Sequence, residues 1–223
     1  MLADLFAFLG LFFDLAWSAM WFGTSAFVRA ALSSEARNTA LLIAFLAGVS
    51  EMTGQSVILV INRVPLYRFL ASLAFTGVTY IVTAIIWALA TIIVAPLTRI
   101  GTLAPSEIAA AIGIIALSFS PRLFAFLSLA PYFGVALANF LEAWAMALVV
   151  FGLHVALDMP VGAALFCGSI GWLLSYGLRT YLGHLLARPL GRLRVLISGS
   201  ALDRTPAKIL DDLAKRINPE RHS

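Results

Sequence analysis

The stretch from residue 69 to residue 98 contains thirty consecutive residues without a charged side chain. A second uncharged stretch of twenty residues covers 159–178. About twenty apolar residues are enough to cross the hydrocarbon core of a bilayer as an α-helix, and a backbone in lipid must satisfy its own hydrogen bonds. The whole chain is 61% hydrophobic and 12% charged, whereas soluble domains are about 45–50% apolar and about 25% charged. The sequence therefore predicts an all-α polytopic membrane protein.

Apolar runs along the chain predict six segments of membrane length. They cover approximately residues 5–28, 39–61, 69–95, 107–129, 131–157 and 161–181. The first segment contains Asp14 and could either span the bilayer or lie in the outer interface as an amphipathic helix; we favour spanning. The prediction is thus a five-helix transmembrane bundle preceded by one apolar helix.

Three regions follow from this pattern. Residues 1–36 form an N-terminal apolar helix and loop, residues 37–182 the transmembrane bundle, and residues 183–223 a basic tail. Near the start of the tail, basic residues alternate with Leu, Val and Ile, which suits binding to anionic lipid headgroups; they are Arg188, Arg192 and Arg194. A short amphipathic helix follows, which either rests on the membrane or bundle or docks a protein partner.

The distribution of basic residues predicts the orientation. Nine of the fifteen Lys and Arg residues lie from Arg179 onward, so the positive-inside rule makes the C-terminal tail cytoplasmic. Counting back through six segments leaves twelve basic residues inside and three outside. The Arg-rich and Ala-rich composition is typical of a bacterial protein, so we expect the inner (plasma) membrane.

Polar side chains inside the apolar segments are the candidate functional residues. They are Asp14, Glu51, Gln55, Arg122, Asn139 and Glu142. At about 1.5 Å per residue, the three carboxyl groups fall near the middle of the bilayer. Such groups are costly in lipid and usually face the bundle interior. In one interpretation they are neutral, hydrogen-bonded packing groups, with Glu142 pairing with Arg122. In the other they line a path for a cation or proton.

Several other residues of the last two segments are expected to have structural roles. Ala164, Gly168, Gly171 and Ser175 recur at helical spacing, and this small-residue strip predicts a helix-packing face. We expect Trp172 and Tyr176 to contact the interface or lipid. His154 lies near the outer end of the fifth segment, where an interfacial role is expected.

Catalytic and metal-binding motifs are missing from the sequence. It contains no GxSxG and no HExxH motif. Three scattered histidines and one cysteine do not make a zinc site, and Cys167 cannot form an internal disulfide. We therefore expect no enzymatic activity, no cofactor, no metal and no nucleic-acid partner.

The part of the chain from about residue 37 to residue 181 resembles the YIP family, the Ypt/Rab-GTPase-interacting membrane proteins. The resemblance rests on five spans, on LAPYFG at residues 129–134 before a late span, and on the Ala- and Gly-rich AALFCGSIGWLLSYG at residues 163–177. The Asp-Leu-Tyr-Gly-Pro signature of eukaryotic members is absent. The resemblance implies a five-helix bundle and a non-enzymatic role in organising the membrane or binding a partner. The alternative is a small cation- or proton-coupled transporter that uses Glu51 and Glu142.

Overall fold

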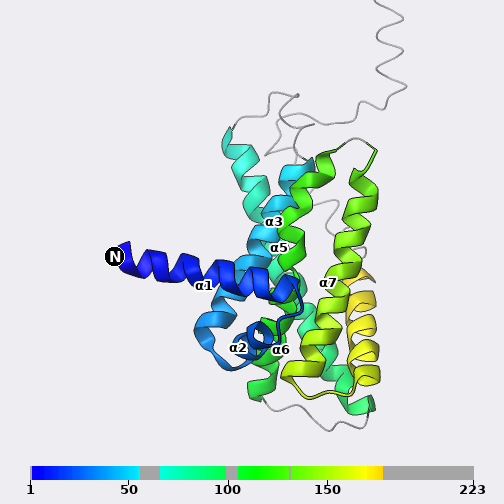
Figure 1. The fold of residues 1–223 in the computed structure, drawn as a ribbon. Helices are drawn as coiled ribbons and strands as arrows, with labels where there is room; N and C mark the ends of the chain where they lie inside the picture. The colour runs from blue at the N-terminus through cyan, green and yellow to red at the C-terminus, as the bar shows by residue number, and fades with distance from the viewer. Residues whose placement is uncertain (1, 56–65, 99–104, 131, 178–223) are drawn as a thin grey trace, which may run out of the picture. The chain divides into compact units, whose positions relative to one another are not determined.

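The computed structural model describes residues 2–55, 66–98, 105–130 and 132–177 (Figure 1). Every regular element within these ranges is a helix, and they contain no strand, which confirms the predicted all-helical class. Contacts divide the chain into two units, Met1–Tyr181 and Leu182–Ser223. The second unit lies outside the described residues, and so do the expectations for Arg188, Arg192, Arg194 and the tail helix.

The described residues form nine helical elements in chain order. Their bounds are α1 Leu2–Met20, α2 Thr24–Leu32, α3 Ser34–Gln55, α5 Leu66–Val94, η1 Ala95–Thr98, α6 Pro105–Ser118, η2 Ser120–Leu129, α7 Gly134–Ala156 and the helix Val161–Gly177. Four stretches are long and apolar enough to cross a membrane: Ala3–Met20, Phe69–Val94, Glu107–Leu129 and Gly134–Ala156. The helix α3, with polar residues at both ends, is not among these four, and the helix Val161–Gly177 is shorter.

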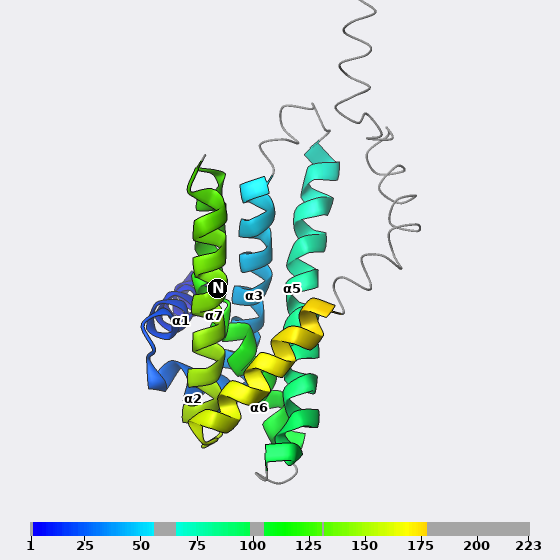
Figure 2. The ribbon, with the colours of Figure 1, turned by 90° about the vertical axis from the view of Figure 1, so that its right-hand side faces the viewer.

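The predicted first segment is two helices rather than one. The chain turns sharply between α1 and α2 at Phe22, whose φ is 58°. Gly23 follows because there is no room for a side chain: an added Cβ would lie 2.7 Å from the Ser18 carbonyl oxygen. Figures 1 and 2 show α1 running across the direction of α3, α5 and α7 rather than alongside them. The second of these helices, α2, contacts α3, α6 and α7.

Small residues bring the helices of the core close together. The buried apolar residues of α2, α3 and α6 are mostly alanines. Gly48 of α3 faces the backbone of α5, where an added Cβ would lie 2.7 Å from the Thr76 carbonyl oxygen. Gly113 of α6 faces α2 in the same way, 2.5 Å from the Ala30 carbonyl oxygen. Helices that meet at small residues approach closely, as is common in membrane bundles.

The predicted fourth segment is broken at Phe119. The α-helix α6 ends at Ser118, and the ten residues Ser120–Leu129 continue as the 3₁₀-helix η2. Pro121 lies in the first turn, where its missing N–H costs nothing. The Ser50 hydroxyl of α3 donates to the Leu123 carbonyl oxygen at 2.8 Å and accepts from the Phe126 N–H at 3.0 Å. A side chain of α3 therefore satisfies backbone groups of the irregular helix.

The helix Val161–Gly177 packs against α5 and α7. Figure 2 shows it crossing obliquely from the end of α7 toward α5. The predicted small-residue strip faces inward: the Trp87 indole of α5 donates to the Gly168 carbonyl oxygen at 3.1 Å, and its ring leaves no space for a side chain at Gly171. At the preceding turn, His154 Nδ1 lies 2.6 Å from the Met159 carbonyl oxygen.

Candidate functional site

Arg122 lies just after the helix break and is almost completely buried. Its side chain is 9% exposed, and Nη2 lies 3.3 Å from Glu142 Oε2 of α7 and 3.9 Å from Glu51 Oε2 of α3. The guanidinium carbon also lies 5.3 Å from the centre of the Tyr80 ring of α5, a cation–π distance. The Arg122 side chain, which belongs to η2, therefore contacts residues of α3, α5 and α7.

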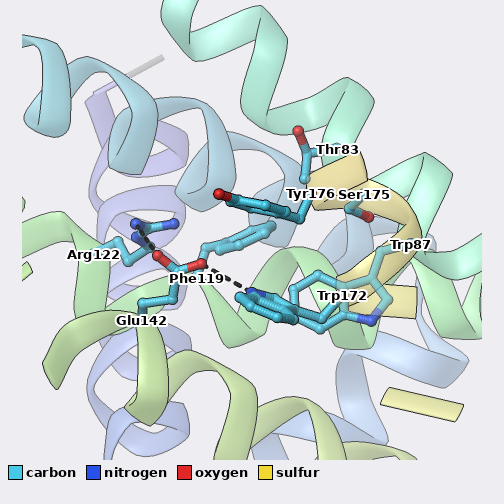
Figure 3. A pocket seen from close by; sticks show the side chains of 8 residues that line it. All are labelled: Thr83, Trp87, Phe119, Arg122, Glu142, Trp172, Ser175 and Tyr176. Carbon is cyan, nitrogen blue, oxygen red and sulfur yellow. Dashed lines mark hydrogen bonds and ion pairs between the residues drawn. The ribbon is translucent and has the colours of Figure 1, made fainter. Parts of the chain in front are cut away.

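Glu142 is held on both of its carboxylate oxygens. Oε2 faces Arg122, and Oε1 accepts a hydrogen bond from Trp172 Nε1 at 2.9 Å (Figure 3). The side chain of Glu142 is still 42% exposed. A carboxylate that accepts from two donors keeps a fixed orientation, so Glu142 presents its charge in a defined direction.

Glu51 is bound less tightly. Its Oε2 is buried and accepts no hydrogen bond within the described part of the chain, and 3.9 Å to Arg122 is an ion-pair distance rather than a hydrogen bond. The three groups thus contain one guanidinium and two carboxyl groups. With both carboxyl groups ionised, the net charge of the three groups is −1. The cluster therefore has the capacity to take up one further positive charge.

A small cavity lies beside Glu142 and opens between α5, η2, α7 and the helix Val161–Gly177. Four aromatic rings form most of its wall: Trp87, Phe119, Trp172 and Tyr176. The polar residues of the wall are Thr83, Arg122, Glu142 and Ser175 (Figure 3). The centre of a water-sized sphere has about 30 Å³ in which to move. Ser175 is 5% exposed, and its hydroxyl makes no hydrogen bond with any residue that the structure describes.

The structure brings together three of the six predicted polar residues. Glu51, Arg122 and Glu142 meet, as described above. Asp14 instead forms an ion pair with Arg29 across the α1–α2 turn. Asn139 is exposed and makes no bond to Glu142, although both lie on α7 one turn apart. Gln55 ends α3, and its side chain lies outside the described residues.

Trp172 and Ser175 belong to the site, although the sequence interpretation expected Trp172 at the interface or in lipid and Ser175 in a packing face. The Trp172 side chain is half-buried, and its indole donates a hydrogen bond to Glu142, a contact that the sequence did not predict. The sequence did contain a signal that these two residues lie near the interior. Ser175 belongs to the predicted small-residue strip, and Trp172 directly follows Gly171 of that strip. Tyr80, 2% exposed beside Arg122, stood in the middle of an uninterrupted apolar run and gave no comparable signal.

The described residues contain no group of three or more His, Cys, Asp or Glu side chains placed to hold a metal ion. No family model, curated protein or solved structure matches the chain. The resemblance to the YIP family therefore stays a prediction.

Proposed function

We propose that the chain is a multi-pass integral membrane protein without enzymatic activity, which organises the membrane or binds a protein partner. The observation that carries the proposal is an uninterrupted apolar stripe on the outer face of α5. Its residues are Phe75, Val78, Val82, Ile85, Leu89 and Ile93, all of them exposed. They recur every three or four residues and so share one helix face.

The length of this stripe fits a bilayer. At about 1.5 Å per residue, its ends are about 27 Å apart, and the hydrocarbon core is about 30 Å thick. A contiguous exposed apolar surface of this size is rare on soluble monomers and marks contact with lipid or another protein. Arg122 is buried inside the same bundle with two carboxyl partners, and ionisable groups within a membrane usually face the bundle interior and pair with one another.

The remaining parts of the proposal come from the sequence. The basic tail places the C-terminus in the cytoplasm and against anionic headgroups, in a bacterial inner membrane. The resemblance to the YIP family and the missing catalytic motifs support a non-enzymatic role. Because α1 runs across the other helices, its arrangement favours the interfacial alternative for the first segment over spanning in parallel with them.

Site-directed spin labelling tests the membrane placement of the stripe. In a Cys167→Ala background, a nitroxide is attached at Val78, Ile85 or Leu89, and the protein is reconstituted in lipid. We expect each label to collide readily with oxygen, which concentrates in the hydrocarbon, and poorly with a water-soluble nickel complex. A label at Tyr132, fully exposed between η2 and α7, is the control and should show the reverse. Equal access of the nickel complex to the α5 labels would refute the proposal.

A second candidate function is transport of a cation or proton. The observation that favours it is that Glu51 and Glu142 both lie within ion-pair distance of the same guanidinium nitrogen of Arg122, with one carboxyl group in excess. Liposomes that contain the protein should then move a cation or proton down an imposed gradient, and Glu142→Gln should stop the flux. Liposomes no more permeable than empty ones would leave only the first function.

A further inference from the structure

We propose that the cavity beside Glu142 binds one small ammonium-type cation, for which the ammonium ion itself is the probe. The inference concerns a ligand and goes beyond the proposed membrane role. It combines four observations, namely the acceptor capacity of Glu142 and Ser175, the aromatic walls, the net charge of the cluster around Arg122 and the size of the cavity.

Acceptor groups for a small N–H donor face the cavity from two helices. The Glu142 carboxylate comes from α7, and each of its oxygens has a second lone pair beyond the bonds to Arg122 and Trp172. The Ser175 hydroxyl comes from the helix Val161–Gly177 and is buried without a hydrogen-bond partner among the described residues. A buried hydroxyl without a partner is unfavourable, so a donor or acceptor in the cavity would stabilise it.

The walls select among cations. Trp172 and Tyr176 are stacked with ring centres 5.6 Å apart, and Trp87 and Phe119 meet edge to face at 6.1 Å. Ring faces attract ammonium-type cations. Bare alkali ions need several oxygens to replace their hydration shell, whereas this wall is mostly carbon. The cavity therefore favours ammonium over sodium or potassium.

The charge of Arg122 does not exclude a cation, because two carboxyl groups already face it. A bound monovalent cation would bring the cluster of three groups from −1 to neutral. Arg122 also lies on one side of the cavity, and Ser175 and Trp87 lie on the other (Figure 3). The guanidinium of Arg122 and the hydroxyl of Ser175 thus line different parts of the cavity.

The volume limits the size of the ligand. About 30 Å³ available to the centre of a water-sized sphere is room for one or two particles of that size. The ammonium ion is about as large as water and fits, whereas tetramethylammonium does not. Size therefore separates specific binding in the cavity from general effects of organic cations.

Thermal unfolding of the full-length protein in lipid nanodiscs tests the inference. Ammonium chloride replaces sodium chloride at constant pH and total chloride. We expect Tm to rise with ammonium and to saturate, because a ligand that binds only the folded state stabilises it according to its concentration over Kd. Potassium and tetramethylammonium should leave Tm unchanged. A Tm that is the same in all four salts, or that changes only with pH, would overturn the inference.

Variants localise the effect. Ser175→Ala removes one acceptor and should weaken the apparent affinity for ammonium by about tenfold, as expected for about 1.4 kcal/mol from a hydrogen bond to a charged group. Glu142→Gln keeps an acceptor for Trp172 but removes the charge, and should abolish the response. Asn139→Ala, exposed one turn away on α7, is the control and should respond like the wild type.

An unchanged response in Ser175→Ala would place the binding elsewhere and refute the site, even if Glu142→Gln fails to fold. Spin-label accessibility on α5 is measured separately, so this outcome leaves the proposed membrane role unaffected.

Discussion

Arg122 connects residues that are far apart in the sequence, because its partners come from α3, α5 and α7. Taking a guanidinium out of water is costly, and the two carboxyl groups and the Tyr80 ring offset that cost. The net contribution of such a cluster to stability is small when it is intact. Replacing one member of the cluster at a time lowers stability more, because each replacement leaves a charged side chain without its partner.

Arg122→Met should lower the stability of the folded protein. Removing one partner of a buried ion pair costs about 3–5 kcal/mol, and we expect about 1–3 kcal/mol here because Glu142 is 42% exposed and screened by solvent. Thermal unfolding in detergent measures the loss. Glu142→Gln and the double variant complete a double-mutant cycle. Purely additive effects in the cycle would show that the two side chains do not interact.

Ser50→Ala tests the connection between α3 and η2. The variant leaves the part-buried Leu123 carbonyl and the more exposed Phe126 N–H without their partner, at a cost of about 1 kcal/mol. Ser169→Ala is the matched control, because Ser169 is half-buried and makes no hydrogen bond to the described residues through its side chain. Equal melting temperatures for the two variants would mean that water replaces the Ser50 hydroxyl.

The sequence was informative about which polar residues lie deep in the bundle and less informative about the direction in which they face. Counting residues along each segment put Glu51 and Glu142 at similar depth, and the structure places both beside Arg122. Asn139 and Trp172 show the limit of such counting. Asn139 shares a helix face with Glu142 but is exposed, and Trp172 is directed inward, because the rotation of a helix is set by its neighbours.

At the scale of elements, the uncharged run of the third segment was the easiest to predict. The expected helix over 69–95 agrees with α5, Leu66–Val94, since hydropathy alone determines such a helix. The breaks were harder. The turn between α1 and α2 depends on close contact of Gly23 with Ser18, and the change from α6 to η2 depends on Ser50 of a distant helix. Neither contact is visible in local hydropathy.

Glycine substitutions test the close packing of the helices. Gly113→Ala places a Cβ 2.5 Å from the Ala30 carbonyl oxygen, and we expect a loss of about 1–3 kcal/mol from the forced separation of α6 and α2. Gly10→Ala is the control, because nothing lies within 4 Å of its added Cβ. Since alanine favours a helix over glycine by up to about 1 kcal/mol, this control should unfold at the same temperature or slightly higher. Equal losses in both variants would contradict tight packing at Gly113.

At the scale of the whole molecule, the distribution of basic residues makes a prediction about sidedness. A reporter that is active only in the cytoplasm should be active when fused after Ser223 and silent when fused after Asp158, between α7 and the helix Val161–Gly177. A reporter that requires the outside should give the opposite pattern. Activity of the cytoplasmic reporter at Asp158 together with silence at Ser223 would invert the topology.

The 3₁₀ geometry of η2 also determines how the chain tolerates changes in length. Three residues complete one turn, so the buried residues Phe119, Arg122 and Ala125 follow one another along a single edge, while Phe124, Phe126 and Leu127 are exposed. A substitution alters one position. One residue inserted after Phe119, in contrast, rotates every later residue of η2 by a third of a turn about the helix axis. Arg122 would then rotate away from Glu51 and Glu142 at once, and Phe126 would lose Ser50. We therefore expect one inserted residue between 119 and 125 to lower Tm more than a single substitution there, whereas three inserted residues would restore the phase but move Arg122 about 6 Å along the helix axis.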